Sequence, residues 1–342
     1  MKAGKGLERA KEVHASVRLR LGLPPSPPKG GLKCGICINE CEVPRGEVGY
    51  CGVWRNVGHL KAEFKVYTYL DPLPTNCVAS PTCPAATSRG YPTFTDVRGP
   101  EVGYFNLAVF AYGCTLDCLF CQNWEHKVDL FSVRPRSPEE LVEEALRPDV
   151  RCVCFFGGDP TPLMPHLIGV SREILKRSKG IKRICWETNG LANPRLMKLA
   201  AEISLKSGGT VKVDWKAWNP RVYEALTGVS GEKALKRLKH NTRLVAELGL
   251  QRPDPPLLVV SVLLVPLYVT LEEVRKIAEH VASLPGEVPL VLLAFYPTWF
   301  MSDLPPTSRE HAEAAVRVAR EAGVKEVYLE NVHLLSDAEY PF

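Results

Sequence analysis

Long apolar segments are scarce in this sequence, and the few apolar runs are interrupted early. The run at residues 257–265 carries no charge, but it is far shorter than the roughly 20 residues that cross a bilayer. Residues 1–5 lead into a charged stretch and not into an apolar signal region. We therefore expect a cytoplasmic protein without a membrane partner.

Glutamine is scarce as well, with only Gln122 and Gln251 against 29 prolines. Avoidance of thermolabile amides is typical of a thermophile. Neither sign of charge is in large excess, since the net charge is +5 over 342 residues. This charge permits RNA or an acidic protein as partner but demands neither. Apolar residues make up 45%, enough for one large domain with a sizeable core and a smaller part beside it.

Cysteine, in contrast, is abundant, with twelve in the chain. Disulfides are rare in a reducing cytoplasm, so this many thiols there favours metal ligation. Composition divides the chain into three parts. We predict an N-terminal helix over 7–22 and a Pro/Gly linker within 1–31, a Cys-rich metal-binding module at 32–103, and a barrel domain at 104–342.

From residue 106 onward, apolar strand patterns alternate with helical ones. Predicted strands cover 106–112, 152–156, 183–187, 211–216, 257–265 and 290–296. Predicted helices cover 137–147, 163–178, 194–206, 231–248, 270–284 and 307–322. Such β-α units predict an α/β fold, a full or partial TIM-like (β/α) barrel of parallel strands, with its chemistry at the carboxyl ends of the strands.

Three local patterns add detail to this outline. Ser137 with Glu140, and Thr307 with Glu310, have the spacing of a capping box at a helix start. Residues 60–66 alternate roughly between apolar and polar side chains and predict a strand.

The first strand of the barrel leads into Cys114, Cys118 and Cys121, a C-x3-C-x2-C loop. A [4Fe–4S] cluster usually takes four cysteines, so three ligands would leave one iron free to bind a small molecule. A partial zinc knuckle and a chance arrangement are the alternatives. Two further strands end in Gly157-Gly158-Asp159 and in Glu187-Thr188-Asn189, and a fourth carries Asp214 and Lys216. Glycines let a ligand approach the backbone, and inward-facing charges in a barrel are costly unless paired or ligand-bound.

These motifs resemble those of the radical S-adenosylmethionine (SAM) superfamily, in which the open iron binds SAM. One electron from the cluster then cleaves SAM to methionine and a 5′-deoxyadenosyl radical. The resemblance is closest to the branch of AmmeMemoRadiSam-system radical SAM proteins, beside glycyl-radical activases such as pyruvate formate-lyase activating enzyme. It rests on Cys34 to Arg55, on Cys121-Gln122-Asn123-Trp124 and on Gly157-Gly158-Asp159, where Asp replaces the usual Glu.

The resemblance implies which residues bind SAM. Phe120 would lie near the adenine, and the glycines of Gly157-Gly158-Asp159 would hold the amino group. Glu187 and Asp214 would hold the ribose, the amino group or a monovalent cation, with Thr188 and Asn189 beside them. Lys216 would pair with the carboxylate, although an internal Asp214–Lys216 ion pair is the alternative. Ser261, in the fifth strand, would face the ligand or bond locally.

The N-terminal cysteines Cys34, Cys37, Cys41 and Cys51 form a C-x2-C-x3-C-x9-C element. Their spacing suits a zinc site or an auxiliary iron–sulfur cluster, and it does not decide between them. Cys77 and Cys83 are two further candidate ligands, which could equally line a substrate channel. Cys152, Cys154 and Cys185 lie inside predicted strands, where small buried apolar side chains are expected.

Several other residues near strand ends have no assigned role. His126 could donate a proton or contact substrate, but a solvated loop histidine is the simpler interpretation, and His333 shares this ambiguity. Tyr296 and Trp299 could shape a substrate pocket or pack at the rim.

The sequence therefore predicts a radical SAM enzyme, an oxidoreductase whose cofactors are a [4Fe–4S] cluster and SAM, with zinc or a second cluster at the N-terminal cysteines. Protein activation or modification is the favoured reaction, and modification of RNA or of a small molecule is the alternative. A reductant such as ferredoxin or flavodoxin would be a partner. An iron–sulfur electron carrier or a zinc-ribbon nucleic-acid-binding protein is a non-enzymatic alternative, but neither needs Gly157-Gly158-Asp159 or Asp214 with Lys216.

Overall fold

The computed structural model describes residues 3–342 and alternates strands with helices through most of the chain. The strands of the main sheet are β5 (Val66–Pro72), β6 (Phe105–Ala111), β7 (Val150–Gly157), β8 (Arg183–Thr188), β9 (Val211–Asp214), β10 (Leu258–Leu264), β11 (Leu290–Ala294) and β12 (Val327–Glu330). The helices are α1 (Ala3–Arg20), α2 (Pro84–Thr87), α3 (Glu125–Val128), α4 (Pro138–Ala145), α5 (Met164–Arg177), α6 (Pro194–Ser207), α7 (Pro220–Thr227), α8 (Gly231–Gly249), α9 (Leu271–Ala282) and α10 (Arg309–Glu321).

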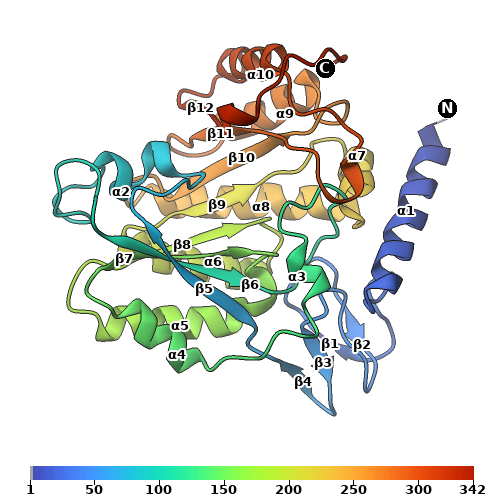
Figure 1. The fold of residues 1–342 in the computed structure, drawn as a ribbon, viewed down its shortest axis with the longest axis horizontal. Coiled ribbons are helices and arrows are strands. Elements are labelled where there is room, and N and C mark those ends of the chain that lie inside the picture. Colours follow the sequence, from blue (N-terminus) through green and yellow to red (C-terminus); the bar gives the residue numbers. More distant parts are fainter. Residues whose placement is uncertain (1–2) are drawn as a thin grey trace.

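One eight-stranded sheet organises the molecule, in the order β12-β11-β10-β9-β8-β7-β6-β5. Strands β6 to β12 run parallel, and β5 pairs antiparallel with β6. Among the described residues β5 and β12 do not pair with each other, so the sheet is a partial barrel. Figure 1 shows the longer helices along one side of this curved sheet and α1 at the edge of the molecule. The predicted α/β partial barrel with parallel strands is confirmed.

Side chains alternate between the two faces of each strand, as the period of two requires. Val153, Phe155, Trp186 and Val213 point to the helix-covered face, and none of them is exposed to solvent. The Phe155 and Trp186 rings pack with centroids 4.7 Å apart. Polar and sulfur-bearing side chains are thereby left to the concave face, which makes that face chemically distinct.

The Cys-rich segment forms small elements below the sheet: β1 (Leu32–Lys33) pairs with β2 (Glu42–Val43), and β3 (Trp54–Asn56) pairs with β4 (Leu60–Ala62). The predicted strand at 60–66 is thus broken, because Lys65 N donates to Glu63 O (3.0 Å) and the chain turns before β5 begins. No helix within residues 3–342 has both the length and the apolarity that a membrane span needs.

The predicted capping box at Ser137 is confirmed, since its hydroxyl accepts from Glu140 N while the Glu140 carboxylate accepts from Ser137 N. The capping box predicted for Thr307 and Glu310 is wrong. Helix α10 is capped by Ser308, which accepts from His311 N (3.1 Å). Thr307 instead joins two strand ends, because its hydroxyl donates to Leu264 O (2.8 Å) and accepts from Phe295 N (2.7 Å).

Residues 73–103 lie across the amino-terminal end of the parallel strands, opposite the loop that carries Cys114 (Figure 1). Their main anchor is Glu101, which accepts from Thr95 Oγ1 (2.6 Å) and from Arg183 Nη1 (2.9 Å). The Glu101 and Arg183 side chains are both fully buried. Because β5 belongs to the main sheet, the boundary at residue 103 does not coincide with a break in that sheet, and the division into three parts stays a prediction.

The buried Glu101–Arg183 pair yields a stability prediction. Glu101→Ala leaves the Arg183 guanidinium buried without its carboxylate, which we expect to lower the free energy of unfolding by roughly 3–5 kcal/mol. Chemical denaturation of wild type and variant measures this loss. Glu143→Ala, which removes one of the two exposed carboxylates that pair with Arg177, is the control and should change nothing measurable. If both variants lose the same free energy of unfolding, burial of the Glu101–Arg183 pair is not the cause of the loss.

Candidate functional site

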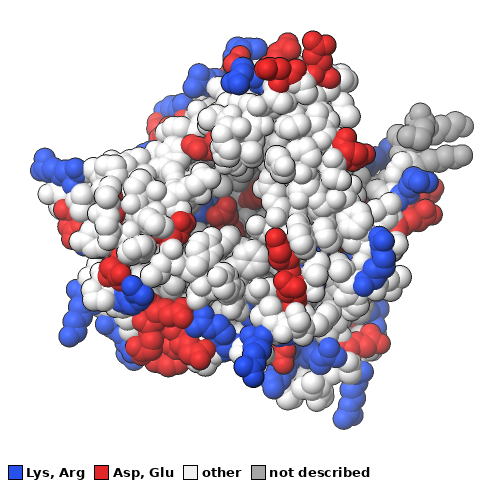
Figure 2. Space-filling view, viewed as in Figure 1, with Lys and Arg blue, Asp and Glu red and all other residues white. Residues whose placement is uncertain are grey.

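The carboxyl ends of β6, β7, β8 and β9 meet around one pocket, as expected for parallel strands. The pocket encloses about 800 Å³ including its open mouth. Figure 2 shows the hollow near the centre of this face, with acidic and basic side chains visible inside it and mostly uncharged surface around it. The predicted site residues that line it are Cys114, Cys118, Cys121, Phe120, Gly157, Gly158, Asp159, Glu187, Thr188, Asn189, Asp214 and Lys216.

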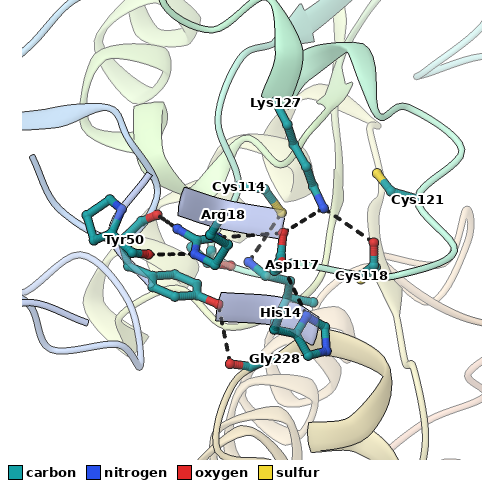
Figure 3. A network of polar contacts seen from close by, with 12 residues as sticks. His14, Arg18, Tyr50, Cys114, Asp117, Cys118, Cys121, Lys127 and Gly228 are labelled. Atoms are coloured by element: carbon teal, nitrogen blue, oxygen red, sulfur yellow. Dashed lines mark hydrogen bonds and ion pairs between the residues drawn. The ribbon is translucent and has the colours of Figure 1, made fainter. Parts of the chain in front are cut away.

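The cysteine loop is held in place by Asp117, the residue before its second cysteine. Its carboxylate is 1% exposed and accepts from His14 Nδ1 and from Lys127 Nζ, both at 2.9 Å. Arg18 Nη1 lies 3.6 Å from Asp117 Oδ1, the same oxygen that accepts from Lys127. Figure 3 shows these side chains arriving at Asp117 from different directions, with the three cysteines beside them. The loop is thus tied to α3, which follows it closely, and to α1, which lies about a hundred residues earlier in the sequence.

The charge of Asp117 is stabilised despite its burial. Burial alone would raise the pKa of this carboxyl, but the His14 hydrogen bond and the charges of Lys127 and Arg18 hold the pKa below its ordinary value. The loop backbone is also fixed, since Asp117 N donates to Thr227 O (2.8 Å) and Leu119 N to Leu226 O (3.0 Å) at the end of α7. The loop therefore has a defined shape before any ligand binds.

The three thiols of this loop are suitable donors for an iron–sulfur cluster. Burial raises the pKa of Cys118 to about 12, and it also raises the pKa of Cys114 and Cys121. They are therefore neutral thiols until iron displaces their protons. Among residues 3–342 no three His, Cys, Asp or Glu side chains are already arranged to hold a metal ion. The fit to a cluster rests on three soft donors facing one pocket, with room for a further ligand on the open side.

The glycines after β7 leave space that a side chain would fill. Gly157 has a φ of +108°, and a Cβ atom on it would lie 2.7 Å from Ala111 N. A Cβ on Gly158 would lie 2.4 Å from Gly113 O and 2.7 Å from the His126 ring. The turn can approach β6 at Gly157, and Gly113 and His126 at Gly158, this closely only without side chains, so both positions require glycine.

Asp159 connects the ends of β7 and β8 through hydrogen bonds. One carboxylate oxygen accepts from Thr188 Oγ1 (2.8 Å) and from Asn189 N (3.0 Å). Burial raises the pKa of Asp159 even though these bonds favour its charged form. Asn189 extends these contacts to the cysteine loop, because its Nδ2 donates to Thr115 Oγ1 (2.7 Å). Asp159, Thr188 and Asn189 thus link the loops after β6, β7 and β8.

Lys216 and Asp214 form an ion pair at the pocket wall. The second Asp214 oxygen, Oδ1, is buried without a hydrogen-bond partner, and the Lys216 ammonium lies 5.5 Å from the centre of the Phe120 ring. Although burial would lower it, the Asp214 charge raises the pKa of Lys216 above its ordinary value. An unpaired buried carboxylate oxygen and a charged lysine suit the amino and carboxylate groups of a ligand.

The remaining candidate residues lie outside this pocket, except for His126, which lines it. Ser261 is buried and lines neither this pocket nor the second one below, because Leu263, two residues further on, takes the pocket position. His126 is buried, not solvated, and burial lowers its pKa to about 3. Trp299 packs on Trp124 with parallel rings 5.4 Å apart at the rim. Tyr296 and His333 are exposed and line no pocket described here.

Three polar lining residues had no individual role predicted from the sequence, namely Gln122, Asn123 and Lys127, which lie within six residues after the last cysteine. Asn123 Nδ2 donates to Gly157 O (3.0 Å), which ties the cysteine loop to the glycine turn. The Cys-Gln-Asn-Trp tail was a sequence signal for Gln122 and Asn123, although it did not reveal their contacts, and no motif pointed to Lys127.

The N-terminal cysteines Cys34, Cys37, Cys41 and Cys51 line one small cavity of their own. Burial raises the pKa of Cys34 to about 12, and Tyr50 N donates to Cys41 Sγ (3.3 Å). Their assignment to zinc or to a cluster stays a prediction.

Cys77 and Cys83 lie in neither group. They line a second cavity, which extends from the first toward the amino-terminal end of the strands and shares Gln122, Asn123, Phe156 and Glu187 with it. Cys152, Cys154 and Cys185, expected as small apolar residues, face this polar cavity too.

Comparison with known proteins gives a family for this arrangement. Residues 108–281, half of the chain, match the family model described as the Radical SAM superfamily. The chain is 27% identical to the uncharacterized protein MJ0808 of Methanocaldococcus jannaschii over 313 residues, which cover 88% of this chain and 81% of that protein.

Two further similarities cover less of the chain. A 7-carboxy-7-deazaguanine synthase of Hyperthermus butylicus is 30% identical over 194 residues, which cover 55% of this chain and 80% of the relative. A solved domain of a pyruvate-formate lyase-activating enzyme from Bacteroides vulgatus aligns with a TM-score of 0.40 and 19% identity, and covers 52% of this chain and 98% of that domain.

The close approach at Gly158 leads to a prediction. Gly158→Ala must displace the Gly113 carbonyl or His126, which we expect to cost about 1–3 kcal/mol of stability and to weaken SAM binding. Gly169→Ala, on the exposed face of α5 with open space around it, is the control and should preserve SAM binding. Thermal unfolding and SAM titration of both variants make the comparison. Unchanged SAM affinity in Gly158→Ala would mean that the turn does not contact the cofactor.

Proposed function

Because the chain belongs to the radical SAM superfamily, we propose that it abstracts a hydrogen atom from a substrate bound at the junction of its two cavities. One observation carries this proposal: the cluster cysteines, the glycine turn and the Asp214–Lys216 pair line one pocket, and that pocket opens into a second cavity. Substrate and cofactor can therefore be adjacent while surrounded by protein, which positions them and excludes water.

Cys114, Cys118 and Cys121 would hold the [4Fe–4S] cluster of the superfamily. When bound, the cluster supplies the electron that cleaves SAM to methionine and a 5′-deoxyadenosyl radical. The chain itself fixes the loop through Asp117 and places Lys127 beside it, with Lys127 Nζ 3.3 Å from Cys118 O. A fixed cation near three thiolates offsets part of their negative charge.

The opposite wall of the pocket would hold SAM. Lys216 is oriented by Asp214 and by the Phe120 face, and its ammonium can receive the SAM carboxylate. Asp214 Oδ1, which lacks a partner, can accept from the SAM amino group. Glu187 faces both cavities and already accepts from Lys212 Nζ (3.1 Å), so it borders the cofactor on one side and the substrate on the other.

A protein or peptide is the substrate class that we favour. Tyr69, at the mouth of the second cavity, and Tyr67 beside it are exposed on β5, the antiparallel strand at the edge of the sheet. An edge strand offers unpaired backbone groups along which an extended segment can bind. The mostly uncharged surface around the hollow suits such a segment better than a phosphate backbone, which argues against RNA.

A small molecule is the second candidate, and one comparison favours it. The relative from Hyperthermus butylicus is named a 7-carboxy-7-deazaguanine synthase, an activity on a small molecule. An external reductant is required in either case, and we expect ferredoxin or flavodoxin. A cytoplasmic location and a thermophilic source stay predictions.

The two substrate classes are separable by size. We expect a fraction of cell extract above 10 kDa, from the organism that encodes the chain, to raise 5′-deoxyadenosine formation several-fold over the uncoupled rate. A fraction below 3 kDa serves as the matched control. Stimulation by the small fraction alone would overturn the protein-substrate proposal and favour a small molecule.

Loss of one cluster ligand tests the cofactor assignment. Cys118→Ala leaves two thiolates, too few to retain a cubane, so about four irons per chain and all SAM cleavage should be lost. Iron analysis after anaerobic reconstitution and chromatography of 5′-deoxyadenosine measure both. Normal SAM cleavage by this variant would disprove the proposed function.

The Lys216 contact is tested by a substitution of similar size. Lys216→Met removes the ammonium but keeps the contact with Phe120, so SAM affinity should fall about tenfold to a hundredfold, or roughly 1.5–3 kcal/mol, with iron content unchanged. Lys239→Met, at an exposed lysine that packs on Trp218, is the control. If titration finds equal affinities, Lys216 serves only as the ion-pair partner of Asp214.

A further inference from the structure

The fold sorts all twelve cysteines into three groups, each lining its own cavity. Four belong to the N-terminal module and three to the loop after β6. The remaining five, Cys77, Cys83, Cys152, Cys154 and Cys185, line the second cavity, which we call the cysteine chamber. No motif joins these five in the sequence, so only the fold reveals the group.

The five thiols come from three segments. Cys152 and Cys154 alternate on β7, and Cys185 on β8 is the direct register partner of Cys154. These three face the concave side of the sheet. Cys77 and Cys83 arrive from residues 73–103, which cross the amino-terminal end of the strands and enclose the chamber from that side.

Two buried cations contact the chamber sulfurs. Lys212 Nζ donates to Cys77 Sγ (3.0 Å) and to Cys154 Sγ (3.2 Å). Arg183 donates to Cys152 Sγ from both Nε and Nη2, each at 3.2 Å. The Lys212 side chain is 1% exposed and that of Arg183 is fully buried. Cysteines that merely fill a core need no cations, and here each buried cation contacts sulfur in addition to the carboxylate with which it pairs.

We infer that the cysteine chamber binds a second iron–sulfur cluster, separate from the one at Cys114, Cys118 and Cys121. Thiolates are soft ligands that select zinc, copper(I) or iron–sulfur clusters. Five thiols line the chamber, more than the four that a tetrahedral zinc site takes, and a cluster can be held by three or four of them. Each ligating thiol releases its proton to solvent when the cluster binds.

The charges of Lys212 and Arg183 suit a bound iron–sulfur cluster. A cluster with thiolate ligands is an anion, and hydrogen bonds and positive charges at its sulfurs stabilise it and raise its reduction potential. Lys212 and Arg183 provide both, while Glu187 and Glu101 hold them in place. Such a cluster would border the junction of the cavities. That last point rests on the proposed function, whereas the cluster site itself does not.

Iron analysis in a simplified background tests the inference. Cys118→Ala removes the first cluster, so the remaining iron belongs to other sites. Adding Cys77→Ala and Cys83→Ala, both in the loop segment and outside the strands, should remove about two to four further irons and as much acid-labile sulfide per chain. Adding Cys34→Ala and Cys37→Ala instead is the matched control, and should leave the chamber iron in place.

Iron content that does not change on loss of Cys77 and Cys83, or one zinc ion in place of iron, would overturn the inference. Circular dichroism establishes that each variant is folded. Lys212→Met provides a second measurement, since it keeps every thiol. In a redox titration followed by electron paramagnetic resonance, the chamber cluster of this variant should have a more negative reduction potential than that of wild type. If every iron centre of the variant has the same potential as its counterpart in wild type, the inference is also overturned. Neither readout depends on SAM cleavage.

Discussion

A single buried carboxylate, that of Asp117, holds the site together. It lies inside the cysteine loop and is paired with His14 and Arg18 from α1 and with Lys127 from α3. Arg18 also stacks on Tyr50, with 3.5 Å between the guanidinium carbon and the ring centre, which links α1 to the Cys-rich segment. Without Asp117, three buried cationic or polar side chains would lose their common partner. The loop geometry, the position of α1 and the position of the N-terminal module therefore depend on each other.

Much of the architecture was predictable from local pattern. Strands β10 and β11 are almost entirely apolar, since both of their faces are covered, and the helices between the strands are amphipathic. Residues at the ends of those strands converge by topology alone, which is why Gly157, Glu187 and Asp214 could be assigned to one pocket. Period-two alternation puts Lys212 on the same face of β9 as Asp214.

Other features depend on contacts between distant residues, which no local pattern contains. Strand β5 was missed because it lies in the Cys-rich segment and is recognisable only by its pairing with β6. Asp117 looked like an ordinary loop residue, because its partner His14 is 103 positions away. The strand cysteines resembled small apolar residues, since the cations that contact them come from other strands. Each failure concerns a polar contact across the fold.

The docking of α1 also has a consequence for the order of events during synthesis. His14 hydrogen-bonds to Ala225 O (3.0 Å), 211 positions later in the chain. At about 5–20 residues per second, roughly ten seconds or more separate the emergence of these two partners from the ribosome. Asp117 and α1 are already available to each other during the second half of that interval, whereas the carbonyls of Leu226 and Thr227 that fix the loop backbone are not. The cysteine loop therefore acquires its support from α1 first and its support from α7 only later.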